Sequence, residues 1–240
     1  MNNVFDDMGQ FWAEIASQNH TQDQISFLKT QLKPDHIVLD LACGTGRHLT
    51  PLSEAGYCVV GVDVSRRLLK IAHQHGAKAL VLGDVRFLPF KEGAFSSSVS
   101  MDTSFGYLAS EGDDAHTLTE AKRVLKKGGI LVLDVFNREH LTRKYRGKPS
   151  EPKTLEYSSF VLVQKRNVSS DGSRLQDEWT IKQPSGETTV YEHAVRLYLR
   201  RDLERMLTSA GFEVNNVLGS YELQLYNSDS SRLILVTSAR

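Results

Sequence analysis

The chain has 240 residues, a length that suits one large α/β domain with a small insertion, and its 29 basic and 29 acidic side chains balance. This balance favours neither nucleic acid nor an anionic membrane, no apolar run reaches the roughly 18 residues of a membrane span, and the acidic first residues do not form a secretory signal. The two cysteines, Cys43 and Cys58, are too few for a disulfide framework, so we expect a cytoplasmic protein with reduced thiols.

The first part of the chain predicts two helices followed by strands that alternate with helices. Amphipathic helices are expected over residues 5–16 and 22–32, ended by Pro34. Buried strands are expected at 37–41, 57–62, 79–82, 95–101 and 130–135. The helices between them are expected at 47–55, 66–75 and 113–125. This alternation predicts βαβ units in a parallel sheet.

The pattern changes after the fifth strand. Between residues 155 and 199 apolar and polar positions alternate, as in an antiparallel sheet with one solvated face, and strands are expected at 160–165, 175–181 and 191–199. The α/β pattern then resumes, with a helix at 201–209 and strands at 213–218 and 233–238. We therefore divide the chain into an N-terminal helical lid segment (1–34), a core (35–142 and 200–240) and a β insert (143–199) that acts as a lid or a dimer contact.

The stretch VLDLACGTGRHL, from Val38 to Leu49, combines a buried strand, a turn of small residues and the start of a helix. This arrangement makes room for a cofactor above the carboxyl end of a strand, and small residues let the backbone approach it closely. A dinucleotide fingerprint would need glycine or alanine at the position of Leu49, so the sequence does not favour NAD or NADP.

Three acidic residues mark the ends of successive predicted strands. Asp40 ends the first, Asp63 the second, and Asp84 follows the third. Because parallel strands bring their carboxyl ends to one edge of the sheet, we expect the three carboxylates to lie close together. The second is well placed to accept both hydroxyls of a ribose, and Asp84 with Val85 could present an oxygen and an N–H to an adenine edge.

These motifs resemble those of class I S-adenosylmethionine-dependent methyltransferases. The matching pieces are DLACGTG, GVDVS, GDVRFLPF, RVLKKGGILVLD, AGFEV and the closing RLILV, over roughly residues 35–240 apart from the insert. SFGYL, RLY and SRLILV resemble small-molecule methyltransferases with a β insert after strand five. The family implies a Rossmann-like seven-stranded, mostly parallel sheet with an antiparallel last strand, helices on both faces, and a small antiparallel insert.

The resemblance also implies the cofactor and the residues that contact it. S-Adenosyl-L-methionine is the expected cofactor, S-adenosyl-L-homocysteine the product, and no metal is expected. Ala42 stands where the family usually has the first glycine of the turn, and Asp102 and Thr103 are expected beside the sulfonium with Met101. The implied cofactor-binding residues are Asp40, Ala42, Gly44, Gly46, Asp63, Val64, Asp84, Val85 and Met101.

The methyl acceptor is expected to be a small molecule, methylated on oxygen or nitrogen, and no motif names a catalytic residue. Arg196 would suit an acceptor with a carboxylate or phosphate. The best candidates for the acceptor pocket are Tyr107, Arg196, His193 and Tyr226. Further candidates are His116, Tyr191, Tyr198 and Tyr221.

Two other functions stay open at this point. An RNA or protein methyltransferase is favoured by one basic cluster: Arg138, Arg143, Lys144, Arg146 and Lys148. The neutral charge and the lack of an added RNA-binding module argue against a nucleic-acid partner, and no membrane partner is expected. A non-catalytic binder is disfavoured because the three strand-end carboxylates are intact. A homodimer could form through edge strands of the insert.

Overall fold

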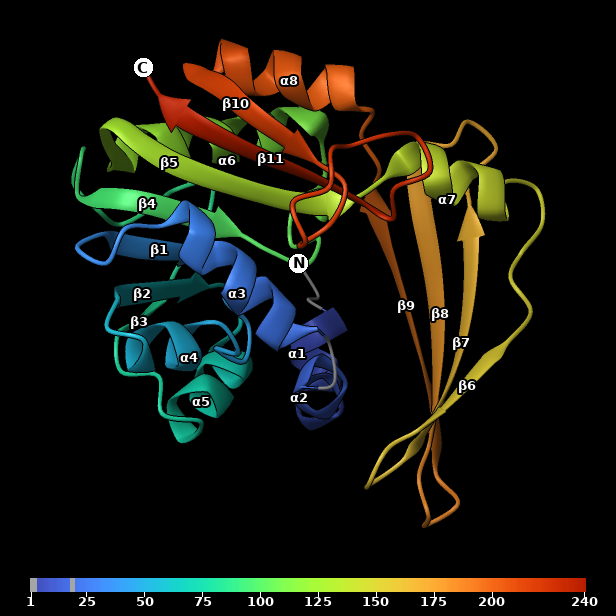
Figure 1. The fold of residues 1–240 in the computed structure, drawn as a ribbon. Coiled ribbons are helices and arrows are strands. Elements are labelled where there is room, and N and C mark those ends of the chain that lie inside the picture. The colour runs from blue at the N-terminus through green and yellow to red at the C-terminus, as the bar shows by residue number, and fades with distance from the viewer. Residues whose placement is uncertain (1–3, 18–19) are drawn as a thin grey trace.

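The protein consists of two β-sheets and the helices that pack on them (Figure 1). The computed structural model describes residues 4–17 and 20–240. The strands are β1 (Ile37–Leu41), β2 (Cys58–Asp63), β3 (Leu80–Leu82), β4 (Phe95–Ser100), β5 (Leu125–Phe136), β6 (Lys153–Glu156), β7 (Val161–Val168), β8 (Arg174–Lys182), β9 (Thr188–Arg196), β10 (Phe212–Leu218) and β11 (Arg232–Ala239). The helices are α1 (Val4–Met8), α2 (Gln10–Ser17), α3 (Thr21–Gln31), α4 (Leu49–Glu54), α5 (Arg66–Gln74), α6 (Glu111–Val124), α7 (Arg138–Tyr145) and α8 (Arg200–Ser209).

The larger sheet has seven strands in the order β10-β11-β5-β4-β1-β2-β3. Neighbours from β5 to β3 are parallel, whereas β11 runs antiparallel to both β5 and β10. This confirms the predicted fold class, including the antiparallel last strand. In Figure 1 the arrows of β2 and β4 point toward the side of the molecule where α1, α2 and the second sheet lie. The carboxyl ends of the parallel strands, where α/β proteins bind their ligands, therefore face these elements.

Side chains of the central strands are buried on both faces of this sheet. Val38 packs in the same cluster as α3 and α4, whereas its neighbour Leu39 packs in the cluster formed with α6 and α8. In β5, Val132 packs in the cluster with α3 and α4, and its neighbour Leu133 packs in the cluster with α6 and α8. Successive side chains of a strand point to opposite faces, so a strand covered on both sides is apolar throughout. This explains the apolar runs of β1 and β5, whereas β4 combines apolar residues with buried serines.

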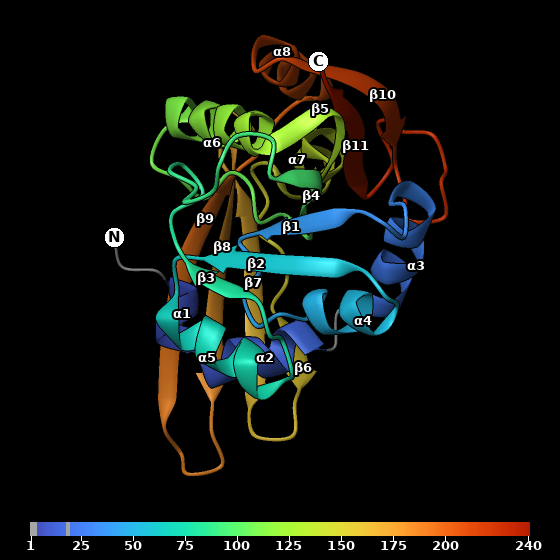
Figure 2. The same cartoon turned by 90° about the vertical axis from the view of Figure 1, so that its left-hand side faces the viewer.

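The second sheet is a four-stranded antiparallel meander, β6-β7-β8-β9, which extends away from the core as a long blade (Figure 1). The N-terminal helices pack on it, with Met8 and Ile15 in one cluster with Trp179 and Ile181. Glu14 of α2 also accepts a hydrogen bond of 2.7 Å from the Ser158 hydroxyl in the β6–β7 turn. Figure 1 shows α1 and α2 between this blade and α5 of the core, and Figure 2 looks along this direction with α5 in front. Helices α1 and α2 and the second sheet therefore lie next to the carboxyl edge of the large sheet.

Some elements differ from the sequence prediction. The expected helix over 5–16 is two helices, because at Gly9 the chain adopts a positive φ of 47° and a Cβ would lie only 2.1 Å from the Arg67 side chain. Helix α7 and strand β6 were not expected: α7 buries only Leu141, so it has no apolar periodicity to detect. Residues 1–3 and 18–19 of the proposed lid segment lie outside the described residues. Within the part of the chain that the structure describes, no helix is long and apolar enough to cross a membrane.

Candidate active site

A cavity of about 930 Å³ lies at the carboxyl edge of the large sheet. Its walls on the core side come from the loops that follow β1, β2, β3 and β4, and its opposite wall comes from α1, α2 and β9. Small-molecule sites usually measure about 300–1,000 Å³, so this cavity is at the large end of the range. It has room for a nucleoside-sized cofactor and a second small molecule.

Asp63, at the end of β2, connects this strand to the turn after β1. One carboxylate oxygen accepts the Gly44 N–H at 2.8 Å, and the other accepts the Ser65 N–H at 2.8 Å. Ser65 in turn caps α5 by accepting the Leu68 N–H at 2.9 Å. Burial raises the pKa of Asp63 while these N–H donors oppose the rise. The carboxylate is thus held in one orientation at the cavity wall, with lone pairs left for a ligand.

The turn after β1 has the open backbone that the sequence predicted. Ala42 and Gly44 both adopt a φ of 55°, a left-handed conformation that a side chain usually disfavours. A Cβ at Gly44 would meet only Trp12 Nε1, at 3.9 Å, so the backbone here faces open space beneath α2. Trp12, Ala42 and Gly44 all line the cavity.

Gly46 is a predicted cofactor contact that the structure does not bring to the cavity. Its φ is 74°, and an added Cβ would lie 2.9 Å from the Cβ of Ala72 in α5. This glycine therefore permits close packing of the turn against α5. The sequence alone could not separate the two roles, because the contact with Ala72 depends on where α5 lies.

Gly46→Ala is expected to lower the free energy of unfolding by about 2–4 kcal/mol. Alanine is strained at this positive φ, and its Cβ would be too close to Ala72. Gly56→Ala is the matched control, because Gly56 also has a positive φ (93°) but nothing lies within 4 Å of its would-be Cβ, and it should lose only about 1–2 kcal/mol. Urea unfolding measures both. If the two variants lost equal stability and Gly46→Ala also bound the cofactor more weakly, Gly46 would instead be a ligand contact.

Asp40, at the end of β1, is buried at 2% exposure and lines the cavity. Its Oδ2 atom has no hydrogen-bond partner among the described residues and lies 3.9 Å from Nδ1 of His48. Burial raises the pKa of Asp40 to about 7, and Arg47 opposes this rise. An unpaired buried carboxyl is unfavourable, so a cationic ligand group would stabilise it.

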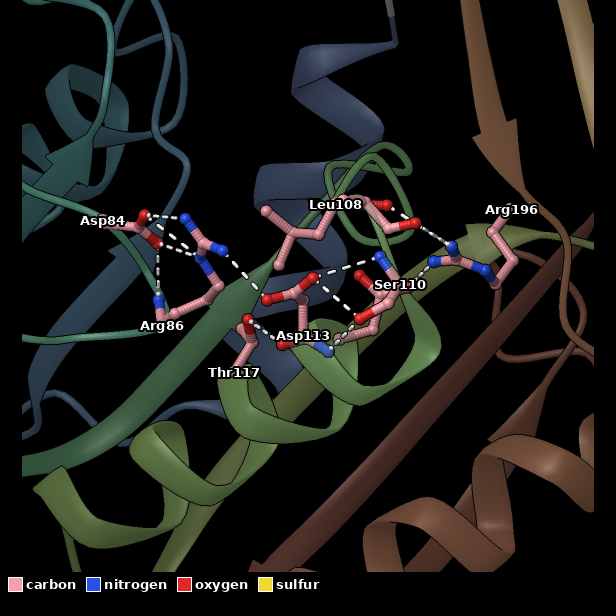
Figure 3. Close-up of polar contacts among 9 residues, drawn as sticks. Asp84, Arg86, Leu108, Ser110, Asp113, Thr117 and Arg196 are labelled. Atoms are coloured by element: carbon pink, nitrogen blue, oxygen red, sulfur yellow. Dashed lines mark hydrogen bonds and ion pairs between the residues drawn. The ribbon is translucent and has the colours of Figure 1, made fainter. Parts of the chain in front are cut away.

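Asp84, after β3, is already engaged by a residue that the sequence analysis did not single out. Arg86 donates from Nη2 to one Asp84 oxygen at 2.6 Å and from Nε to the other at 3.1 Å (Figure 3). The same guanidinium donates to Asp113 at 2.9 Å, and Asp113 forms a capping box with Ser110 at the start of α6. Hydrogen bonds from Arg86 lower the pKa of Asp84, so this carboxylate is ionised and fixed in place. Asp84 and Val85 line the cavity as predicted.

The loop after β4 forms a further part of the cavity wall. Met101, Asp102 and Thr103 line the cavity, and the last two have positive φ values of 53° and 63°. This strained pair is held by Asp134, whose carboxylate accepts the Asp102 N–H at 2.8 Å and whose carbonyl accepts the Thr103 N–H at 2.9 Å. Arg232 adds a hydrogen bond of 3.0 Å to the Thr103 hydroxyl. Backbone strain of this kind needs such support and often occurs at functional sites.

Two of the candidate acceptor residues meet in the cavity. Tyr107 and His193 both line it, and their ring centroids lie 6.1 Å apart. Phe5 of α1 contacts both rings, at 5.2 and 5.3 Å between centroids. These three rings therefore form an aromatic corner of the cavity wall, between α1, β9 and the loop after β4.

The prediction that Arg196 and Tyr226 form the acceptor pocket is not supported by their positions. Arg196 pairs with the buried Asp114 and donates to the Ala109 carbonyl at 3.2 Å (Figure 3). The Tyr226 hydroxyl donates to Glu139 at 2.6 Å, outside the cavity. Both side chains are taken up by contacts between elements. Four further candidates also lie outside the cavity lining: His116, Tyr191, Tyr198 and Tyr221.

The basic cluster that favoured an RNA substrate is mostly engaged within the protein. Arg138 donates to the Asp171 carbonyl at 2.8 Å, and Arg146 donates to the Ser170 carbonyl at 2.7 Å. Arg143 pairs with Asp229 at 2.6 Å. These contacts hold α7 against neighbouring loops, so three of the five basic residues already have partners.

The chain is similar to methyltransferases over most of its length. A family model described as a methyltransferase domain matches residues 38–129. The putative methyltransferase YqeM of Bacillus subtilis (strain 168) is 25% identical over 96% of this chain and 95% of YqeM. The dTDP-3-amino-3,6-dideoxy-alpha-D-glucopyranose N,N-dimethyltransferase of Streptomyces fradiae is 30% identical over 76% of this chain and 72% of that protein. The solved structure of an S-adenosylmethionine-dependent methyltransferase from Clostridium acetobutylicum ATCC 824 has a TM-score of 0.81, with 18% identity and 99% of both chains covered.

The donor groups of the cavity fit the cofactor of these relatives. The unsatisfied oxygen of Asp40 suits an ammonium group, the fixed carboxylate of Asp63 suits a pair of hydroxyls, and the exposed side chain of Val64 suits the face of a base. No cluster of three or more potential metal ligands occurs within residues 4–17 and 20–240. Sequence, fold and cavity chemistry agree, and this protein belongs to the class I S-adenosylmethionine-dependent methyltransferases.

Proposed function

We propose that this enzyme transfers the methyl group in line to an oxygen or nitrogen of a small-molecule acceptor. The observation that carries this proposal is the cavity itself, whose outer wall is built by α1, α2 and β9. The rings of Phe5, Tyr107 and His193 contact one another at this outer wall, and such an aromatic corner suits a small acceptor better than a polymer. The Streptomyces fradiae relative is named for an amino-sugar nucleotide, which is a small molecule.

We assign the cofactor contacts by the chemistry of each group. Asp40 and the backbone at Ala42 and Gly44 would hold the amino-acid part, and Asp63 would accept the two ribose hydroxyls. Val64 and Val85 would pack on the adenine, with Asp84 at its edge. Met101 would lie beside the sulfonium. Gly46 is left out of this set because it packs on α5.

The chain has little bond-making chemistry to perform, because the sulfonium of the bound cofactor already activates its methyl group. The residues must align the acceptor with that methyl group and exclude water. Alignment of two reactants can contribute about 7–11 kcal/mol to a rate. Phe5, Trp12 and Tyr107 would exclude water at the outer wall, so we assign a lid role to the N-terminal helices and the insert. A homodimer through the insert is a separate proposal that light scattering tests.

Cofactor binding tests the assignment of Asp63. Asp63→Asn should weaken S-adenosylhomocysteine binding about 10–100-fold in calorimetry, because a hydrogen bond to a charged group is worth about 1.5–3 kcal/mol. Asp35→Asn removes an exposed carboxylate distant from the cavity and should bind like the wild type. Full affinity in Asp63→Asn would overturn the assignment.

Methyl transfer tests the acceptor class. Enzyme and S-adenosylmethionine labelled in the methyl group are incubated with a filtered small-metabolite extract, with bulk tRNA or with a protein extract. We expect label to enter the small-metabolite fraction, because α1, α2 and β9 cover the outer side of the cavity. Transfer to tRNA or protein without transfer to small metabolites would contradict the proposal.

A further inference from the structure

His193 of β9 carries a buried nitrogen without a hydrogen-bond partner among residues 4–17 and 20–240. Its side chain is only 6% exposed, and its Nδ1 atom has no hydrogen-bond partner among the described residues. Buried polar side-chain atoms are nearly always paired, so an exception in a cavity wall needs an explanation. His193 lines the cavity, which is where a missing partner can be supplied.

The other ring nitrogen faces a carboxylate that is itself held in place. Nε2 of His193 lies 3.7 Å from Oδ2 of Asp177, its direct cross-strand neighbour in β8. Oδ1 of Asp177 accepts a hydrogen bond of 2.9 Å from Arg166, the next cross-strand neighbour in β7. Arg166, Asp177 and His193 therefore form a row across three adjacent strands, and the row ends at the cavity.

Aromatic rings fix the orientation of this imidazole. Trp179 contacts it edge to face at 4.9 Å, and Phe5 and Tyr107 lie at 5.3 and 6.1 Å between centroids. The charged and titratable groups around the ring are Asp177, Arg166 and the Tyr107 hydroxyl. Burial lowers the pKa of His193, although Asp177 opposes this, so the ring is neutral near pH 7.

A carboxylate beside Nε2 favours the tautomer with the proton on Nε2, because the carboxylate can only accept a proton. Nδ1 then keeps its lone pair and is a proton acceptor. The ring that carries this nitrogen lines the cavity at the aromatic corner assigned above to the methyl acceptor.

We propose that His193 is the catalytic base of this methyltransferase and that Asp177 is its positioning residue. The proposal rests on the small-molecule acceptor binding at this end of the cavity. As the acceptor's oxygen or nitrogen bonds to the methyl carbon, the carbon–sulfur bond breaks and its electron pair stays on sulfur. The proton of that oxygen or nitrogen moves to Nδ1 of His193 and passes to solvent when the products leave.

The tautomer can be measured without any acceptor, by ¹⁵N NMR of histidine-labelled enzyme bound to S-adenosylhomocysteine. The His193 signals are identified by their loss in His193→Gln. We expect a protonated Nε2 and a bare Nδ1 at neutral pH, and an altered tautomer ratio in Asp177→Asn. A proton on Nδ1 in the wild type would overturn the proposal whatever the acceptor is.

Kinetics distinguishes the two kinds of acceptor atom. The probes are dTDP-3-amino-3,6-dideoxy-α-D-glucopyranose and its 3-hydroxy counterpart, with His73→Gln on the exposed face of α5 as the control. For a hydroxyl, His193→Gln should lower kcat about 100-fold or more at every pH, the usual contribution of a general base. For an amine, the loss should shrink at high pH, where the acceptor is already neutral. Unchanged kcat at all pH values on a methylated probe would contradict the proposal.

Cofactor binding separates this proposal from the proposed function. His193→Gln should bind S-adenosylhomocysteine as the wild type does, because the residues assigned to the cofactor lie on the loops after β1, β2, β3 and β4, whereas His193 lies on β9. If the wild type methylates only tRNA or protein, the small-molecule function fails, whereas the NMR result still decides whether His193 can accept a proton.

Discussion

Arg232→Met is expected to lower the free energy of unfolding by about 3–5 kcal/mol, because it leaves the buried carboxylate of Asp134 without its counter-charge. Arg232 lies 2.7 Å from Asp134, and the residues are only 8% and 0% exposed. Asp134 also accepts the hydroxyl of Tyr221 at 2.8 Å, so the ion pair belongs to a buried network beneath the cavity. Removing one partner from such a pair is much more costly than the pair itself is stabilising.

Urea unfolding measures this effect, and Arg143→Met is the matched control. Arg143 also pairs with an aspartate, at 2.6 Å, but this pair is exposed, so the same substitution should cost less than about 1 kcal/mol. Arg232→Met should also weaken cofactor binding, because Arg232 supports the left-handed Thr103 in the cavity wall. Equal losses of stability in the two variants would contradict the role given to the buried pair.

Cofactor affinity is expected to fall as the pH drops below about 7, by about 30-fold between about pH 8 and about pH 5.5. Burial raises the pKa of Asp40 to about 7 in the free protein, so the carboxyl is increasingly protonated below that pH. The ammonium group of the cofactor would favour the ionised form and lower this pKa in the complex. Binding therefore releases a proton at low pH, and the affinity loses up to tenfold for each pH unit.

Calorimetry in buffers of different ionisation enthalpy measures both the affinity and the released proton. Asp40→Asn cannot ionise, so it should bind weakly and with no dependence on pH in this range. The neighbouring His48 does not complicate the result, because burial lowers its pKa well below the usual value. If Asp40→Asn kept the pH dependence of the wild type, the titrating group would be another residue.

The sequence by itself predicted the core sheet and the cofactor end of the site. Buried strands, capped helices and small-residue turns are local patterns, and parallel strands necessarily bring Asp40, Asp63 and Asp84 to one edge. The structure places all three in the cavity lining. The charged helix α7 escaped prediction because its stability comes from tertiary contacts rather than an apolar stripe of its own.

Only the tertiary structure decided which polar side chains are free to act. Arg196 and Tyr226 lie in promising motifs, yet each binds a carboxylate more than 80 residues away in the chain, Asp114 and Glu139. His193 acquires its carboxylate through the register of β8 and β9, which sequence separation does not reveal. Local patterns determine which elements form, whereas pairing between distant elements determines which side chains remain unsatisfied and therefore available to a ligand.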